Sequence, residues 1–412
     1  MHCVREISKD LYWVGTNDRR LALFENVHPI PRGVSYNSYL LLDKKTVLFD
    51  TVDWSGCRQF LENIAYLLGG RPLDYLVVNH VEPDHAAAID EIILRYPKVR
   101  IISNEKAFML MHQFGFSVDG RTDEVREGDT RSFGAHTVTF VSAPMVHWPE
   151  VMVTFDTTSG TLFSADAFGT FGALNGRMFN DEVNFDRDWI DEARRYYTNI
   201  VGKYGPHVQR LLKKAETLDI HTICPLHGPV WRSNLGYYLD KYKKWSTYEP
   251  EEQGVLIVYA SMYGGTEAAA ERLASRLTQK GMPNIAMYDV SSTDVSYLIS
   301  ETFRMSHLVL ASVTYNLGIY PPMLNYLEHM KGLNLQKRTV ALVENGSWAC
   351  TSGKLMRAFL EQQMKNMTVL PEQLSLVSEM KEDKTAELEA LADAILASMN
   401  LPETRTASGE KA

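Results

Sequence analysis

The sequence contains little cysteine. Its 412 residues include only four, which are Cys3, Cys57, Cys224 and Cys350. They are widely spaced and form no C-x-x-C pair, which excludes a disulfide framework, a rubredoxin-type iron site and a zinc knuckle within the chain. Such sparse cysteine fits a reducing compartment, so we expect the protein to lie in the cytoplasm. Cys224 lies close to His227 and has two readings: a metal ligand or, more commonly, a small buried thiol at a strand end.

Long apolar runs and an excess of basic charge are also missing. No stretch approaches the roughly 20 apolar residues needed to span a bilayer, and Met1–Glu6 lacks the apolar segment of a signal peptide. We therefore expect no membrane association. The 51 acidic residues outnumber the 42 basic ones, and the net charge of −9 argues against nonspecific binding of nucleic acid. The hydrophobic share of 45% is that of a globular protein, and the length allows two or three domains.

Histidine and carboxylate residues are concentrated in one short stretch. Four potential metal ligands occupy six residues, and they are His80, Glu82, Asp84 and His85. The largely apolar residues 73–78 before them predict a buried strand, so the cluster lies where a rigid scaffold aims side chains at one point. Pro83 is expected to keep this loop from entering a helix early. Taken alone, the cluster also fits a polar loop in which Asp84 caps a helix.

Three more candidate ligands follow strand-like runs further along the chain. His147 comes after residues 137–141, Asp166 after residues 161–164 and His227 after residues 220–224. Each lies at a strand exit, as the first cluster does. Together the two sets give four histidines and three carboxylates, which is enough for two metal ions that share one carboxylate.

A polar, proline-containing break at residues 245–254 divides the chain. We predict one domain over residues 1–250, a second over residues 251–400 and a disordered tail over residues 401–412. The first domain is rich in strand-like runs with interleaved helices. The second begins with Val255–Tyr259, a continuous apolar strand of the kind buried on both faces of a parallel sheet, and then alternates strands with helices.

The second domain carries a loop suited to phosphate. Residues 261–266, S-M-Y-G-G-T, follow the first strand and precede a helix, whose free N–H groups attract anions. The loop lacks both the P-loop ending and the G-x-G-x-x-G pattern. Its shape resembles the flavodoxin phosphate loop, which favours FMN. Residues 312–318 and 344–350 also follow strands, and all three loops should meet at the carboxyl edge of one sheet.

The residues predicted to contact this cofactor come from the three loops. They are Ser261, Met262, Tyr263, Gly264, Gly265, Thr266, Val313, Thr314, Tyr315, Asn316, Gly318, Asn345, Gly346, Ser347, Trp348 and Ala349. Tyr315, Tyr320 and Trp348 offer aromatic faces to an isoalloxazine ring, although each also fits a core aromatic.

The motif H-x-E-x-D-H at residues 80–85, with the three later ligands, resembles the metal site of the metallo-β-lactamase fold. More narrowly, the chain resembles the flavodiiron proteins over about residues 1–400. Glu82 distinguishes the flavodiiron proteins from the zinc hydrolases of this fold, which usually have histidine at that position. A carboxylate suits iron better than zinc. The resemblance implies a mixed α/β and α+β chain: an N-terminal αββα sandwich followed by a flavodoxin-like, doubly wound parallel sheet.

The same resemblance implies two non-haem iron ions in each chain. His80, Glu82 and His147 would hold the first, Asp84, His85 and His227 the second, and Asp166 would bridge them together with solvent. Some relatives turn the residue that matches His85 away, so its ligation is left open. Asp166 and Tyr197 are the predicted catalytic residues, with Tyr196 as the alternative tyrosine. Residues 167–187 are expected to cover the site, and a helix is expected to follow over residues 188–204.

The resemblance also implies a function. The irons and FMN together would supply the four electrons that reduce O2 to water, or the two that reduce two NO to N2O. A rubredoxin or a similar small protein would refill the flavin. A head-to-tail homodimer, or a dimer of such dimers, would bring each flavin beside the partner's irons. Glu25 and His28 are candidate pocket residues, and the preference between the two gases is left open.

Two other functions fit part of the sequence. One is a zinc-dependent hydrolase with an accessory flavodoxin domain, against which Glu82 argues. The other is an electron carrier or sensor with a vestigial metal site, which the complete set of seven ligand candidates makes less attractive. Metal analysis with a visible spectrum separates the three, because the first needs iron and flavin, the second zinc and the third flavin alone.

Overall fold

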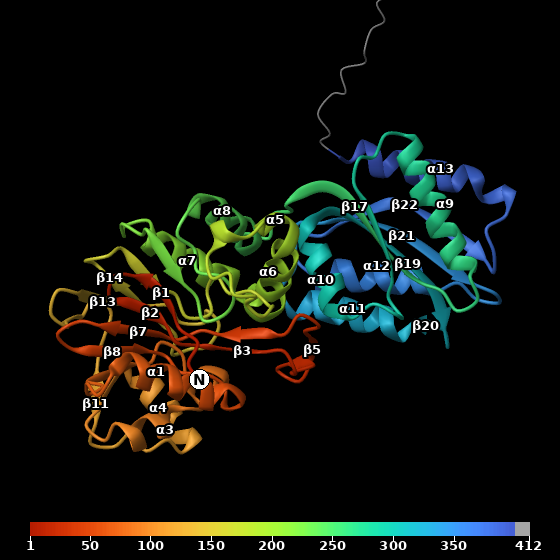
Figure 1. The fold of residues 1–412 in the computed structure, drawn as a ribbon. Coiled ribbons are helices and arrows are strands. Elements are labelled where there is room, and N and C mark those ends of the chain that lie inside the picture. The colour runs from red at the N-terminus through yellow and green to blue at the C-terminus, as the bar shows by residue number, and fades with distance from the viewer. Residues whose placement is uncertain (400–412) are drawn as a thin grey trace, which may run out of the picture. The chain divides into compact units, whose positions relative to one another are not determined.

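The computed structural model describes residues 1–399, so the predicted tail at residues 401–412 lies outside the described residues. The chain divides into two compact units, Met1–Thr247 (unit 1) and the part from Tyr248 onward (unit 2). Each is described here by itself (Figure 1). No helix within residues 1–399 is both long and apolar enough to cross a bilayer.

Unit 1 contains two main β-sheets. The first has seven strands in the order β1 (Arg5–Ser8), β2 (Leu11–Trp13), β7 (Tyr39–Leu42), β8 (Thr46–Phe49), β9 (Tyr75–Val77), β10 (Arg100–Ser103) and β11 (Thr122–Glu124). The second has five, β12 (Thr130–Ser132), β13 (Thr137–Ser142), β14 (Met152–Asp156), β15 (Thr161–Phe163) and β16 (Thr222–Cys224). The Phe49 ring stacks on the Phe163 ring at 3.8 Å between centroids, so the two sheets pack face to face.

Helices cover the outer faces of this pair of sheets (Figure 1). One group consists of α1 (Cys57–Leu68), α3 (Ile89–Arg95) and α4 (Glu105–Phe114), and the other includes α7 (Gly205–Ala215) and α8 (Leu235–Ser246). Two short pairs, β3 (Thr16–Asp18) with β6 (Val34–Tyr36) and β4 (Leu23–Phe24) with β5 (His28–Pro29), complete the strands of this unit. The layers are therefore helix, sheet, sheet and helix.

Two local expectations for unit 1 are wrong. Pro83 does not delay a helix but begins one, α2 (Pro83–Ala86), as its first residue. Proline suits this position because the first helical N–H needs no partner within the helix. The helix expected over residues 188–204 is also broken, since α5 (Phe185–Asp188) and α6 (Ile190–Tyr196) are followed by a π-helical turn at Tyr197–Val201 and a 3-10 turn at Gly202–Tyr204.

Unit 2 is built on one parallel sheet. Its strands run in the order β18 (Ile285–Asp289), β17 (Glu252–Ala260), β19 (Met305–Tyr315), β21 (Thr339–Gly346) and β22 (Thr368–Val377), with β20 (Gly318–Ile319) hairpinned onto β19. The helices are α9 (Gly265–Gln279), α10 (Val295–Arg304), α11 (Pro321–Gly332), α12 (Ser352–Gln363) and α13 (Thr385–Ala397). The chain goes from β17 to β18 on one side and then to β19 on the other. This reversal brings the loops after β17 and β19 together at one edge, where open sheets of this kind bind ligands.

Candidate metal centre and phosphate-loop pocket

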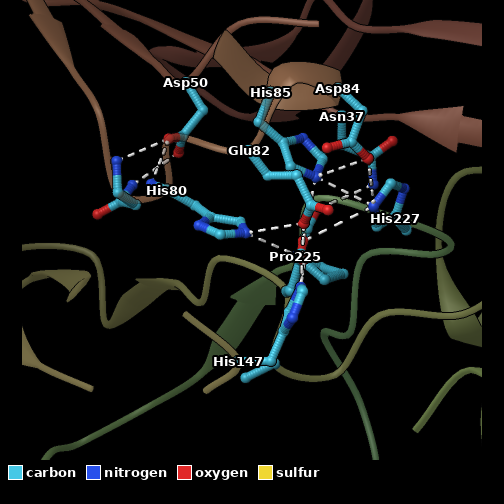
Figure 2. Close-up of polar contacts among 12 residues, drawn as sticks. Asn37, Asp50, His80, Glu82, Asp84, His85, His147, Pro225 and His227 are labelled. Carbon is cyan, nitrogen blue, oxygen red and sulfur yellow. Dashed lines mark hydrogen bonds and ion pairs between the residues drawn. The ribbon is translucent and has the colours of Figure 1, made fainter. Parts of the chain in front are cut away.

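The first ligand cluster and the later candidates come together in unit 1 as two groups of donor atoms (Figure 2). In the first, Glu82 Oε2 lies 3.1 Å from His80 Nε2 and 3.0 Å from His147 Nε2. In the second, Asp84 Oδ2 lies 3.3 Å from both His85 Nε2 and His227 Nε2. The two imidazole nitrogens of this second group are 3.0 Å apart.

Asp166 lies between the two groups and offers one oxygen to each. Its Oδ2 is 3.1 Å from His147 Nε2 and 3.6 Å from His80 Nε2. Its Oδ1 is 3.1 Å from His85 Nε2 and 3.7 Å from His227 Nε2. The side chain of Asp166 is only 1% exposed, so water does not separate these atoms. One carboxylate therefore faces two separate sets of three donors.

This arrangement fits two metal ions. Two ligands at right angles, each about 2.1 Å from an ion, are about 3.0 Å apart, which is close to the separations within each group. Within residues 1–399, neither oxygen of Asp84 has a hydrogen-bond partner, and Asp166 Oδ1 has none either. Buried carboxylate oxygens are rarely left in this state, because desolvation without a partner is unfavourable. A cation would satisfy them.

The pKa directions at the site also indicate a place for positive charge. Burial alone would lower the pKa of His147, but its hydrogen bonds to Asp166 and Glu82 raise it to about 9. Burial raises the pKa of Asp84 to about 7. In the metal-free chain, protons therefore occupy positions that metal ions would take, and metal binding would release them.

Three buried groups behind the ligands hold the histidines in place. His80 Nδ1 lies 2.7 Å from Glu150 Oε1, and His227 Nδ1 lies 2.7 Å from the carbonyl oxygen of Ser35. Both acceptors leave the Nδ1 proton in place, so the Nε2 lone pair of each neutral imidazole points at the centre. Asp50 accepts from the backbone N–H of Asn79 at 2.7 Å, which fixes the start of the ligand loop.

The tyrosine beside the ligands is Tyr196. Its ring centroid lies 5.4 Å from that of His227, and its buried hydroxyl has no hydrogen-bond partner among the described residues. Tyr197, the predicted catalytic tyrosine, instead packs on Tyr242 and Trp245, with centroid distances of 4.9 and 5.2 Å.

Residues from two other parts of unit 1 line the approach to the centre. Phe171, from the stretch expected to cover the site, lies edge-on to Tyr196 at 5.1 Å and to Phe24 at 5.4 Å. Glu25 follows Phe24, and burial together with the nearby charge of Glu82 raises its pKa to about 7. His28 Nε2 is 4.0 Å from Glu25 Oε2. The wall of the site is thus largely aromatic, with one carboxyl group that is easily protonated.

In unit 2, the three predicted loops surround a cavity of about 420 Å³. It is lined by fourteen of the sixteen predicted contact residues, all except Gly264 and Gly318, and also by Leu317, Ser378 and Glu379, which the sequence reasoning missed. Tyr320 does not line the cavity but lies edge-on to Tyr315 at 5.9 Å.

This cavity fits a phosphate-bearing ring compound. The helix α9 begins at Gly265, and the left-handed conformation of Gly264 (φ 90°) turns the chain into it. A Cβ on Gly265 would lie 2.1 Å from the carbonyl oxygen of Ser378, so the two segments approach as closely as glycine allows. Trp348 and Tyr263, which are 88% and 96% exposed, stand at the rim and leave aromatic faces free for a planar ring.

The sequence is similar to those of several known proteins. Residues 34–228 match the family model described as ODP family beta lactamase. The chain is 32% identical over 357 residues to an uncharacterised protein of Methanocaldococcus jannaschii, covering 86% of this chain and 89% of that one. It is 30% identical to the anaerobic nitric oxide reductase flavorubredoxin of Aeromonas hydrophila, covering 85% of this chain and 71% of that one.

Solved structures show the same likeness along nearly the whole chain. The rubredoxin oxygen:oxidoreductase of Desulfovibrio gigas superposes with a TM-score of 0.89 at 27% identity, covering 96% of this chain and 98% of that one. The flavodiiron protein of Giardia intestinalis, at 24% identity, has the same fold with a TM-score of 0.88, covering 96% of each chain.

These comparisons confirm the predicted fold, a metallo-β-lactamase-like domain followed by a flavodoxin-like parallel sheet, and do not favour the hydrolase reading. The chain is an oxidoreductase and belongs to the flavodiiron protein family.

Proposed function

We propose that this protein reduces O2, NO or both at a centre of two non-haem irons, with electrons that arrive through FMN. The observation that carries the proposal is the position of Asp166, whose two oxygens each face a different set of three donors. One set is His80, Glu82 and His147, and the other is Asp84, His85 and His227. His85 belongs to the second set, since its Nε2 faces Asp84, Asp166 and His227.

The donor chemistry favours iron over zinc in this proposal. Three carboxylates offset three of the four positive charges of two divalent ions and stabilise a further rise in metal charge. When bound, the iron pair and FMN supply up to four electrons, which is enough for O2 and twice what two NO require. Each set holds three side-chain donors, and one oxygen of Asp166 adds a fourth. This number leaves coordination positions on each iron that a small gas can occupy.

The chain's own residues would handle the protons. O2 consumes four protons in forming two waters, and two NO consume two in forming N2O and one water. In this proposal Tyr196 donates a hydrogen bond to the bound gas, because its buried hydroxyl has no other partner among the described residues. The carboxyl group of Glu25, with its pKa raised to about 7, holds a proton next to Glu82 near neutral pH. The aromatic wall at Phe24 and Phe171 limits the access of water.

In unit 2, the proposed FMN would place its phosphate at the N-terminus of α9 and its ring against the exposed aromatics. Asn345 Oδ1 is buried without a hydrogen-bond partner in the part of the chain that the structure describes, and the residue lines the same cavity. An amide oxygen in that state suits the N–H or hydroxyl groups of a flavin.

We also propose an external donor and a head-to-tail homodimer. The chain holds no paired cysteines for an iron–sulfur site of its own, so a rubredoxin or a protein like it would reduce the flavin. One structural neighbour is named a rubredoxin oxygen:oxidoreductase, which supports this class of donor. Each proposed site is built within one unit, so electron transfer requires that a flavin and an iron pair be brought together, which a dimer would achieve between chains.

The test begins with the composition of the full-length protein purified under reducing, anaerobic conditions. We expect about two irons and one FMN per chain, and consumption of at least one of the two gases with reduced rubredoxin as donor. Each gas is assayed separately by electrode, with N2O measured by gas chromatography. Zinc at two ions per chain, with no gas consumed after iron reconstitution, would reject the proposal.

A further inference from the structure

Four aromatic side chains form a continuous row in unit 1, from the loop after Asp166 toward the surface. We call Tyr242, Tyr238, Trp231 and Tyr237 the aromatic row. Ring centroids are 5.2 Å apart from Tyr242 to Tyr238 and 4.3 Å from Tyr238 to Trp231. The last step, from Trp231 to Tyr237, is 6.4 Å with the rings nearly parallel at 17°. Apart from cysteine, tyrosine and tryptophan are the side chains that lose one electron most easily. A row of them in contact can therefore pass electrons from ring to ring, which a row of phenylalanines could not do.

The inner end of the row is connected to the metal centre. The backbone N–H of Phe168 donates a 2.5 Å hydrogen bond to the hydroxyl of Tyr242, and the Phe168 ring lies 4.4 Å from the Tyr242 ring. Phe168 is only two residues after Asp166, the carboxylate that faces both donor groups. Tyr242 and Tyr238 are fully buried, so no solvent interrupts this path.

The outer end of the row differs from the inner end in its proton acceptor. The Tyr237 hydroxyl donates to the carboxylate of Asp186 near the surface. The Tyr238 hydroxyl donates instead to the carbonyl oxygen of Gly169 at 3.3 Å, which cannot hold a proton. A tyrosine that loses an electron becomes a strong acid and must also lose its proton. Because the hydroxyl of Tyr237 donates to a carboxylate and that of Tyr238 to a carbonyl oxygen, oxidation is more stable at the outer residue.

We propose that the aromatic row carries oxidising equivalents from the metal centre to the surface when a turnover runs short of electrons. This inference rests on the proposed function. Reduction of O2 to water takes four electrons, and two irons without reduced FMN supply two. A turnover in that state stops after two of the four electrons and leaves a partly reduced form of O2, an oxidant, among buried histidines. The row gives the oxidant a route to Tyr237 that spares the ligands.

The electrons and protons of this step balance. Tyr242 passes one electron to the metal centre and is refilled through Tyr238 and Trp231 by Tyr237. Tyr237 ends one electron short as a neutral radical, and its phenolic proton moves to Asp186. A thiol in solution then returns one electron to Tyr237, and Asp186 returns the proton. Two thiols lose two electrons and two protons in two such events and join as one disulfide.

The experiment compares Tyr237→Phe with Tyr75→Phe. The first removes the outer hydroxyl on helix α8 and keeps the ring, and the second does the same at a tyrosine on strand β9 that is outside the row. Iron-loaded, full-length protein with both irons ferric and FMN oxidised is mixed with hydrogen peroxide and frozen within milliseconds. Hydrogen peroxide stands at the oxidation level of O2 that has taken up two electrons, and neither cofactor then holds the two electrons that its reduction needs, whichever gas the enzyme prefers. We expect a neutral tyrosyl radical by electron paramagnetic resonance in the unchanged protein and in Tyr75→Phe, with loss of most of that signal in Tyr237→Phe.

A second measurement follows the damage. After repeated oxidant pulses without thiol, peptide mass spectrometry should find more oxidised ligand histidines in Tyr237→Phe than in Tyr75→Phe. Gas consumption with an excess of electron donor should be equal in all three proteins, because the row is idle when electrons are plentiful. An equal radical signal and equal damage in the two variants would overturn the inference. The absence of any radical in a protein that reduces its gas normally would overturn it and leave the proposed function standing.

Discussion

The candidate ligands of unit 1 are buried side chains whose donor atoms face one another, whereas the cavity of unit 2 is lined by loop backbone and by aromatics that face solvent. Asp166 is 1% exposed and Trp348 is 88% exposed. A buried charge that loses its partner is destabilised by several kcal/mol, whereas an exposed aromatic loses little when it is exchanged for another. Function in unit 1 should therefore depend on single side-chain atoms, and function in unit 2 on the course of the backbone.

The largest effect is expected at Asp166. The substitution Asp166→Asn keeps the size of the side chain but removes the charge that both donor groups face. We expect loss of at least one iron and a fall in gas reduction of more than about 100-fold, because even residues behind the ligands change metal affinity by 10–100-fold. FMN content should stay unchanged.

Iron analysis, absorbance at the flavin bands and a gas assay check this prediction together. Asp119→Asn, at an exposed position outside the site, is the matched control. Two irons and full activity in Asp166→Asn would show that this carboxylate is not shared between the ions.

The next effect is expected at Glu150, which belongs to neither donor group and positions His80 through its Nδ1. In Glu150→Gln the acceptor oxygen remains but its negative charge is lost, so the imidazole is a weaker ligand. We expect iron affinity to fall by about 10–100-fold. Competition with a coloured chelator measures this, with Glu105→Gln, at an exposed position on α4, as the control. Activity should return with excess ferrous iron, and a variant that cannot be restored this way would indicate a role in the fold instead.

In unit 2 the corresponding test adds a single methyl group. Gly265→Ala would place a Cβ 2.1 Å from the carbonyl oxygen of Ser378, so the phosphate loop must shift. We expect FMN affinity to fall by about 10-fold or more while iron stays bound, since 1.4 kcal/mol is already a factor of ten. Gly236→Ala on α8 is the control, because no atom of the described residues lies within 4 Å of its added Cβ. Flavin fluorescence titration measures both variants, and equal affinities would contradict the assignment of this loop to the phosphate.

The sequence predicts a larger share of the residues at the metal centre than of those around the cavity in unit 2. All seven ligand candidates follow predicted strands in the sequence, and their donor atoms lie together in the structure, because side chains at the ends of adjacent strands converge. Glu150 is not predicted in this way, although its position three residues after His147 indicates an acidic side chain near the ligands. Ser378 and Glu379 could not be found in this way, because only the pairing of β21 with β22 brings Val377 beside Gly346.

The choice between Tyr196 and Tyr197 shows a further limit. Neighbouring residues of a helix point about 100° apart, so only the phase of the helix decides which ring faces His227. Here α6 ends at Tyr196 and a π-helical turn begins at Tyr197, which alters the phase at that position. Such turns have no reliable sequence signal and often occur at functional sites.

The pH dependence of the metal-free protein should reveal how strongly the ligands bind protons. The pKa of His147 in the folded chain, about 9, lies above the ordinary value of 6.5. The folded state therefore binds a proton more tightly than the unfolded state does. The resulting stability is complete below about pH 6.5 and is lost as the pH rises through about 9. Asp84, with its pKa raised to about 7, adds a loss of the same sign at lower pH.

We therefore expect the melting temperature of unit 1 without metal to fall by a few degrees between about pH 6.5 and 9. With iron bound, the metal replaces the protons and this decline should disappear. Scanning calorimetry with and without a chelator makes the comparison, and His147→Gln should make the decline smaller. A melting temperature that rises over this range without metal would contradict the protonated state of His147.

The smallest effect is expected at the rim of the cavity in unit 2. Trp348 is 88% exposed, and Trp348→Phe keeps an aromatic face while reducing its area. Aromatic contacts add about 0.5–1.5 kcal/mol beyond the burial of area, so FMN affinity should fall by less than about 10-fold. Trp54→Phe is the matched control, since Trp54 is 63% exposed and lies in unit 1. If Trp348→Phe weakened FMN as much as Gly265→Ala does, side-chain contact rather than backbone would hold the flavin, and the contrast between the two units would fail.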